Sequence, residues 1–122
     1  MTPSEEGRLY SVQLQNALAF DEDNPDLETL LRGLDEGKYQ LWPGERSVAV
    51  TEVIRHPTER TCHIWLAGGD LDELRTMFPA CERWARHIGC ARMTIVGRDG
   101  WGRAWTKDAG FRPKSTTFVK EF

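Results

Sequence analysis

The stretch TCHIWLAGGDLDELRTMFPACERWARHIGC, residues 61–90, specifies most of the fold of this chain. Residues 61–67 are rich in β-branched and aromatic side chains, which favours a strand, and Gly68 and Gly69 end it. Beyond this turn, apolar residues recur at alternating steps of three and four, the spacing of a buried helix stripe. They are Leu71, Leu74, Phe78, Cys81, Ala85 and Ile88. The stretch predicts a strand, a tight glycine turn and a long amphipathic helix.

Two residues bear on the course of this helix. Pro79 lies inside it, where the ring and the missing N–H predict a kink or a restart. Gly89 is typical of a helix end. The following residues, 92–96, have the composition of another strand.

The residues before this stretch predict two more helices and two more strands. Residues 10–20 are compatible with a short helix, and Asp26 can cap a second one that Gly37 ends. Residues 39–42 and 47–54 have strand character, with the turn residues Pro43 and Gly44 between them. Residues 56–60 predict a hairpin-like connection to the strand at 61–67.

The carboxyl-terminal residues predict a glycine-rich loop at 97–102, a short helical turn at 101–107 and a last strand at 115–120. Antiparallel strands followed by strand, helix and strand predict a mixed sheet with one parallel crossover. The expected class is therefore α+β. We expect a single domain over residues 1–122, with helices in 1–37 and the sheet core in 38–122.

Composition and charge exclude several classes of protein. The 122 residues carry a net charge of −3, and the apolar and charged fractions, 39% and 29%, are those of a globular domain. Residues 1–36 hold nine acids and two bases, whereas the remainder holds ten acids and fourteen bases. Because these bases are scattered among acids, nucleic-acid binding is not favoured. No apolar run is long enough to span a membrane.

The order of these elements, with the sequence AGF at 109–111 before the final strand, resembles the GNAT N-acetyltransferase fold over residues 39–122. Fragments such as LAGGD at 66–70 and GRDGW at 97–101 are similar to those of small GNAT-like proteins of tailed phages and prophages. The resemblance implies a splayed sheet with helices on both faces. It also implies that acetyl-CoA or CoA lies in a cleft between the strands 61–67 and 92–96.

The resemblance assigns cofactor binding to the glycine turn and to the loop at 97–101. The residues implied are Leu66, Ala67, Gly68, Gly69, Asp70, Arg98 and Trp101. In the family, N–H groups at the start of the long helix hold the CoA diphosphate, as orphan amides and the helix dipole attract anions.

The same turn also supports a helix that is capped from within the protein. Asp70 is a suitable N-cap and Glu73 completes a capping-box spacing, while Asp72 adds a third carboxylate. The loop itself, residues 67–73, holds no Arg or Lys to offset them. A diphosphate approaching these three acids would meet repulsion, so a self-capped helix competes with a CoA site.

The candidate catalytic residues are Glu52, His63 and Thr106. Glu52 or His63 would act as the general base, and His has a suitable pKa. Thr106 stands where catalytic relatives often have a tyrosine that protonates the leaving thiolate, and its hydroxyl is a poorer acid. The alternatives are a packed, hydrogen-bonded His63 and a solvent-facing Glu52.

The glycine-rich loop at 97–103 admits two interpretations. Arg98 and Arg103 with Trp101 and Trp105 would suit an anion or nucleotide-like pocket with an aromatic wall. Alternatively, both tryptophans pack on the sheet and Arg98 pairs with an acid.

The three cysteines, Cys62, Cys81 and Cys90, have no C-x-x-C spacing. Cys62 and His63 are adjacent on a strand and so point to opposite faces. We expect buried free thiols and no metal, in a reducing cytoplasm.

Two hypotheses about function follow. The first is an acyltransferase that moves an acyl group from acyl-CoA to an amine. The second is a catalytically inactive GNAT-fold phage protein that binds a phage or host protein, in the host cytoplasm or the virion.

Overall fold

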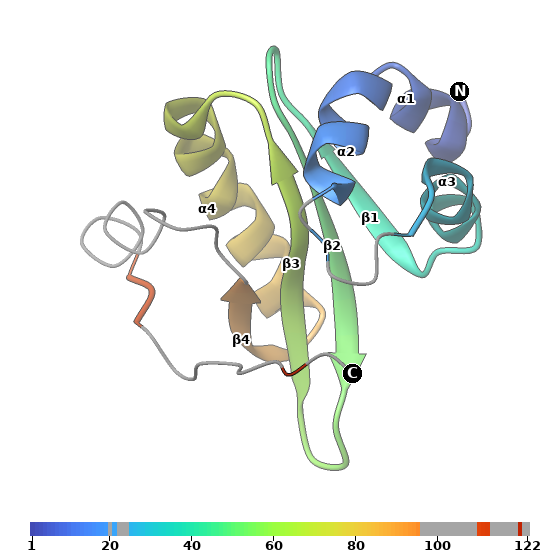
Figure 1. The fold of residues 1–122 in the computed structure, drawn as a ribbon. Helices are drawn as coiled ribbons and strands as arrows, with labels where there is room; N and C mark the ends of the chain where they lie inside the picture. The colour runs from blue at the N-terminus through green and yellow to red at the C-terminus, as the bar shows by residue number, and fades with distance from the viewer. Residues whose placement is uncertain (20, 22–24, 96–109, 113–119, 121–122) are drawn as a thin grey trace.

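The computed structural model of the chain describes residues 1–19, 21, 25–95, 110–112 and 120. Helices and strands follow one another as α1 (Pro3–Arg8), α2 (Ser11–Leu18), α3 (Leu27–Asp35), β1 (Tyr39–Pro43), β2 (Val48–Arg55), β3 (Arg60–Gly68), α4 (Leu71–His87) and β4 (Cys90–Ile95). The long helix α4 lies across one face of the sheet and α1 to α3 gather on the other, toward β1 (Figure 1).

The four strands form one mixed sheet in the order β1-β2-β3-β4. β1 to β3 are antiparallel neighbours, and β3 pairs with β4 in parallel through the crossover helix α4. This confirms the predicted mixed α+β sheet with one parallel crossover. Opposite the Val50/Thr51 step the β2–β3 register shifts by one residue, so β3 carries a bulge at Trp65.

Two apolar clusters lie on opposite faces of this sheet. Leucines of α2 and α3 pack on Val48, Val50 and Leu66, and Trp65 joins them from the same face. On the other face, Ala49, Ile64 and Ala67 pack against Leu74, Phe78 and Cys81 of α4. Because strand residues alternate between faces, each cluster takes every second position of β2.

The helix starts follow from their capping residues. Asp26 precedes α3 and accepts from the Thr29 N–H at 2.8 Å, as predicted. The sequence interpretation missed α1, where Thr2 and Glu5 form a reciprocal capping box and Pro3 takes the first helical position. The sequence of residues 10–20 is compatible with a short helix, and α2 occupies the middle of that range.

α4 runs without interruption from Leu71 to His87, with Pro79 inside it. Of the two outcomes predicted at Pro79, a kink or a restart, the restart does not occur. A proline removes one helical N–H donor, but the buried stripe on either side of it, from Leu74 to Ala85, holds the two halves on one core. None of the described helices has the length and apolar character needed to span a bilayer. The predicted elements at 97–102, 101–107 and 115–120 lie outside the described residues.

Candidate functional site

A row of four polar side chains crosses the whole sheet at one level. The register pairs Tyr39 of β1 with Glu52 of β2, Glu52 with His63 of β3, and His63 with Thr94 of β4. Directly paired residues on neighbouring strands have side chains on the same face, about 4.5–5.5 Å apart at Cβ. The two candidate bases, Glu52 and His63, are thus brought side by side.

This polar row lies on the face of the sheet opposite α4. Cys62 and Ile64 are fully buried, and Ile64 and Cys81 of α4 belong to the same cluster. His63, between Cys62 and Ile64 on β3, therefore points to the face that carries the amino-terminal helices. It is half-buried there, as is Glu52.

His63 is held in place by a hydrogen bond between its Nδ1 and the Thr94 hydroxyl, at 2.8 Å. Burial lowers the pKa of His63 below its ordinary value, and the nearby Glu52 carboxylate offsets part of this shift. The imidazole is therefore neutral at pH 7. When Nδ1 carries the proton and donates to Thr94, Nε2 has a free lone pair and can accept a proton.

Aromatic rings border the β1 end of the polar row. The Tyr39 and Trp65 rings are 4.7 Å apart between centroids, and the Lys38 ammonium lies 5.2 Å from the Tyr39 ring centroid. The Trp65 indole donates to the carboxylate of Asp21. A positive charge over an aromatic ring is an attractive contact, so this border combines an apolar wall with charge.

The turn between β3 and α4 has its donors satisfied from within the protein. The Asp70 carboxylate accepts from the N–H groups of Asp72 at 2.9 Å and Glu73 at 3.3 Å. The Asp70 N–H donates to the Ser47 hydroxyl at 2.9 Å, and Arg46 pairs with the Asp70 carboxylate at 3.3 Å. The predicted N-cap is confirmed. A ligand would have to displace these contacts to reach the Asp72 and Glu73 N–H groups.

Only one of the two reciprocal hydrogen bonds of the predicted capping box is present, the one that the Asp70 carboxylate accepts from the Glu73 N–H. Glu73 does not return to the Asp70 N–H, which Ser47 takes, but accepts from the Arg46 N–H at 2.9 Å. Hydrogen bonds from Ser47 and from the Arg46 backbone lower the pKa of Glu73. The carboxylates of α4 therefore tie its first turn to the β1–β2 connection.

The glycines of the turn are explained by packing. A Cβ on Gly69, whose φ is +114°, would lie 2.4 Å from the carbonyl oxygen of Arg46. A Cβ on Gly68 would lie 3.0 Å from the carbonyl oxygen of Gln13 in α2. Backbone thus leaves no room for a side chain at Gly69 and little room at Gly68, independently of any ligand.

The remaining predicted cofactor residues divide between the core and the undescribed part of the chain. Leu66 is buried with the amino-terminal helices and Ala67 with α4, so their side chains serve the two cores. Arg98, Trp101 and Thr106 lie outside the described residues, and their roles stay predictions.

Sequence reasoning missed Thr94, Ser47 and Arg46. Thr94 and His63 lie on the same face of the sheet because the parallel register pairs them. The sequence pattern does not show this register. Ser47 and Arg46 follow the turn residue Gly44, and their sequence distance from Asp70 hid their contact with it.

The cysteines are free thiols. Cys62 and Cys81 are buried, and burial raises the pKa of Cys62 to about 11 and that of Cys81 to about 12. Cys90 is partly exposed, which differs from the expectation that all three are buried. Among the described residues, no three His, Cys, Asp or Glu side chains come together in a way that would hold a metal ion.

No protein-family model and no curated protein sequence matches this chain. Solved structures do match its fold. A tetramutant of the BH1408 protein from Bacillus halodurans superposes with a TM-score of 0.71 at 12% identity, covering 100% of this chain and 97% of that one. A ribosomal-protein-alanine N-acetyltransferase from Brucella melitensis biovar Abortus gives 0.70 at 9% identity, covering 98% and 95%.

A third structure is an aminoglycoside acetyltransferase from an uncultured soil metagenomic sample, solved in complex with sisomicin. Its TM-score is 0.62 at 12% identity, covering 100% of this chain and 90% of that one. These similarities, with the mixed sheet and the crossover helix α4, show that the chain has the GNAT-like fold of acetyltransferases.

Proposed function

We propose that this chain is an N-acyltransferase that moves an acyl group from acyl-CoA to an amine, with His63 as the general base. The observation that supports the proposal most is the polar row, in which a neutral, half-buried His63 is oriented by Thr94 and paired with Glu52. Burial lowers the pKa of His63 and so favours the neutral ring, which is the form that can take a proton from an attacking amine.

In the proposed reaction, His63 Nε2 removes a proton from the acceptor nitrogen as this nitrogen attacks the thioester carbonyl carbon. The new C–N bond forms and the C–S bond breaks, so the electron pair leaves with the thiolate of CoA. Glu52 stabilises the imidazolium that results, since an opposite charge at the paired position favours the protonated ring. His63 then releases its proton to solvent and the thiolate takes up one, either from solvent or from the Thr106 hydroxyl, which regains its proton from solvent.

The donor end of the proposed site differs from what the resemblance implies. Asp70 occupies the helix N–H groups that would hold a diphosphate, and its carboxylate would repel one. We therefore propose that CoA binds weakly at this turn. The remaining contacts of the donor would come from the β3 backbone around the Trp65 bulge and from Arg98 and Trp101.

The test is thiol release from acetyl-CoA in the presence of a panel of amines that includes an aminoglycoside. Replacing His63 with Gln is expected to lower kcat about 10²- to 10⁴-fold, the usual contribution of a general base. His87→Gln is the matched control, because His87 is exposed at the end of α4, away from the polar row. Equal activity of the two variants would show that His63 is not the general base.

The capped start of α4 also favours a second candidate, a catalytically inactive GNAT-fold protein that acts by binding a phage or host protein. Calorimetry with acetyl-CoA and CoA separates the two. Binding that Asp70→Ser strengthens supports the enzyme, because serine keeps the cap and removes the charge. No heat and no change in melting temperature at high micromolar ligand would support the inactive protein.

A further inference from the structure

The hairpin between β2 and β3 carries two arginines that face each other in the sheet. Arg55 and Arg60 are the last register pair of these antiparallel strands, and a backbone hydrogen bond from His56 to Glu59 closes the turn beyond them. Like charges directly opposite on neighbouring strands are unfavourable. The end of this hairpin therefore concentrates positive charge.

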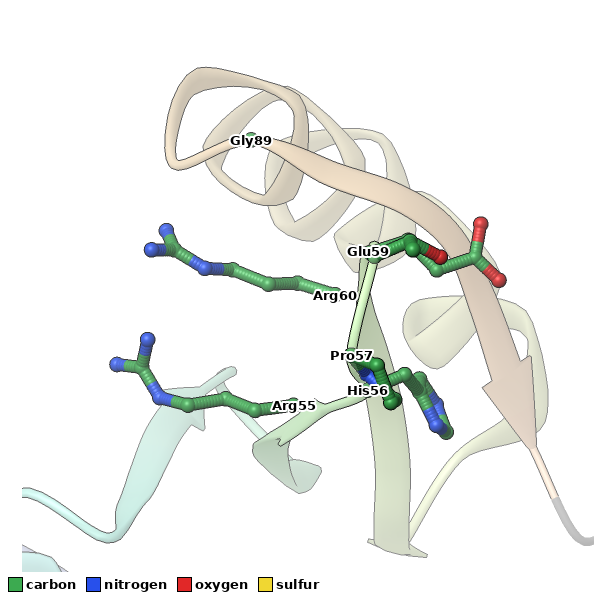
Figure 2. A pocket seen from close by; sticks show the side chains of 7 residues that line it. Arg55, His56, Pro57, Glu59, Arg60 and Gly89 are labelled. Atoms are coloured by element: carbon green, nitrogen blue, oxygen red, sulfur yellow. The ribbon is translucent and has the colours of Figure 1, made fainter.

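Both guanidinium groups extend to the same side of the hairpin, toward an open notch beside Gly89 (Figure 2). The notch has a volume of about 360 Å³ and is lined by the residues 55–60 and 89. Gly89, with φ at +88°, lies in the wall of the notch and has no side chain to fill it. A Cβ at this position would lie 4.0 Å from the Arg60 guanidinium.

One of the two guanidinium groups is fixed by the backbone. Arg60 Nη1 donates to the carbonyl oxygen of Ile88, the C-cap residue of α4, at 2.8 Å. This contact satisfies an orphan carbonyl at the negative end of the helix dipole. It also orients the guanidinium plane, so the other N–H donors of Arg60 have a defined direction.

The carboxylate nearest in sequence does not neutralise this pair. The Glu59 side chain lies on the other side of the hairpin, where it pairs with Arg92 of β4 (Figure 2). In the described part of the chain, neither Arg55 nor Arg60 has a carboxylate partner. The Arg55 guanidinium has no hydrogen-bond partner there either.

We propose that Arg55 and Arg60 form a binding site for the phosphate group of a phosphate monoester. Two guanidinium forks present paired N–H donors, which match the oxygens of a tetrahedral anion. A monoester carries close to two negative charges at pH 7, which balances the two arginines. The notch has room for the phosphate and a small group attached to it. This site is at the far end of α4 from Asp70 and does not depend on acyl transfer.

The test is a titration of the whole protein with O-phosphoserine and with inorganic phosphate, followed by NMR of the arginine side chains at constant ionic strength. We expect saturable shifts of the Arg55 and Arg60 signals with both probes. Serine and acetate at the same concentration should leave these signals in place. Absence of saturable binding by either phosphate probe overturns the proposal.

Three variants make the test specific. Arg55→Gln is expected to weaken phosphoserine binding at least about five-fold, as a charge-assisted contact is lost. Arg55→Lys, which keeps the charge without the fork, should lose part of the affinity. The control is Arg86→Gln, an exposed arginine of α4 that pairs with Glu82. If Arg55→Gln and Arg86→Gln weaken binding equally, the site is general surface charge and the proposal is wrong.

Discussion

The two ends of α4 differ in how their polar groups are paired. At the start of the helix the Asp70 carboxylate accepts from two backbone N–H groups and pairs with Arg46. At the end of the helix Arg60 donates to one carbonyl, and Arg55 beside it has no side-chain partner in the described residues. The first end is closed and acidic, and the second is open and basic. A helix dipole alone predicts the opposite preference, with anions at the start. The Asp70 carboxylate at the start of α4 and the two arginines at its end reverse this preference.

The location of an anion site therefore depends on which donors remain unsatisfied. Orphan N–H groups attract an anion only when no protein carboxylate already accepts from them. Guanidinium groups without a carboxylate partner attract one even at the end of a helix where the dipole is unfavourable. Substitutions at the two ends distinguish these cases, and their expected effects on stability decrease from the closed end to the open one.

The largest difference is expected between two glycines with positive φ, one at each end of α4. Gly69→Ala should lower the free energy of unfolding by about 2–4 kcal/mol, because its Cβ would meet the Arg46 carbonyl at 2.4 Å. Gly89→Ala should cost about 1 kcal/mol, since only backbone strain opposes it. Urea unfolding of both variants measures this, and equal losses would contradict the packing difference.

Loss of the cap at the closed end is the next effect. Asp70→Ala should lower the free energy of unfolding by about 1 kcal/mol, because two N–H groups lose their acceptor. Asp70→Ser is the control and should retain most of that stability. If the two variants unfold at the same urea concentration, the carboxylate is not acting as the cap.

The third largest effect is a dependence of the free energy of unfolding on pH that arises at His63. Burial lowers its pKa, so the unfolded chain, with the ordinary value of 6.5, binds a proton more readily than the folded one. The contribution of His63 to stability is therefore complete above about pH 6.5 and is lost as the pH falls toward the folded-state pKa. Urea midpoints at several pH values should show that His63→Gln flattens this slope. An unchanged slope would mean that His63 titrates normally.

The smallest effect on stability is expected at the open end. Arg55→Gln should leave the free energy of unfolding within about 0.5 kcal/mol of wild type, or raise it slightly, because it removes a like-charge pair. Thermal melting without phosphate measures this. A large loss of stability would show that Arg55 is a structural residue, in contrast to the binding role proposed for it.

Most of the fold was predictable from local patterns. The strand at 61–67, the glycine turn and the stripe of α4 have strong periodicity, and Asp26 and Asp70 signal the helix starts that the structure confirms. α1 was missed because it is only six residues long and shows no apolar period. Of the two outcomes predicted at Pro79, the restart does not occur, because packing on both sides of the proline outweighs its local cost.

The candidate site was predictable only in part. Glu52 and His63 were chosen for their chemistry, but nothing in the sequence places them in one register pair or adds Thr94 to them. The pairing depends on where the strands align, and a shift of one residue would send His63 to the face of α4. Arg46 and Ser47 joined the β3–α4 turn for the same reason.

Local sequence was sufficient to specify the strand, turn and helix of residues 61–90 and the acidic start of α4, because periodicity and capping act over a few residues. The order of these elements along the chain indicated the mixed sheet. Which donors and charges remain available was set only by the packing of distant segments. In the packed structure Asp70 pairs with Arg46, and Glu59 pairs with Arg92 of β4. Arg55 and Arg60 lie opposite each other on neighbouring strands. These pairings follow strand register and turn geometry, which bring together residues that lie far apart in the chain.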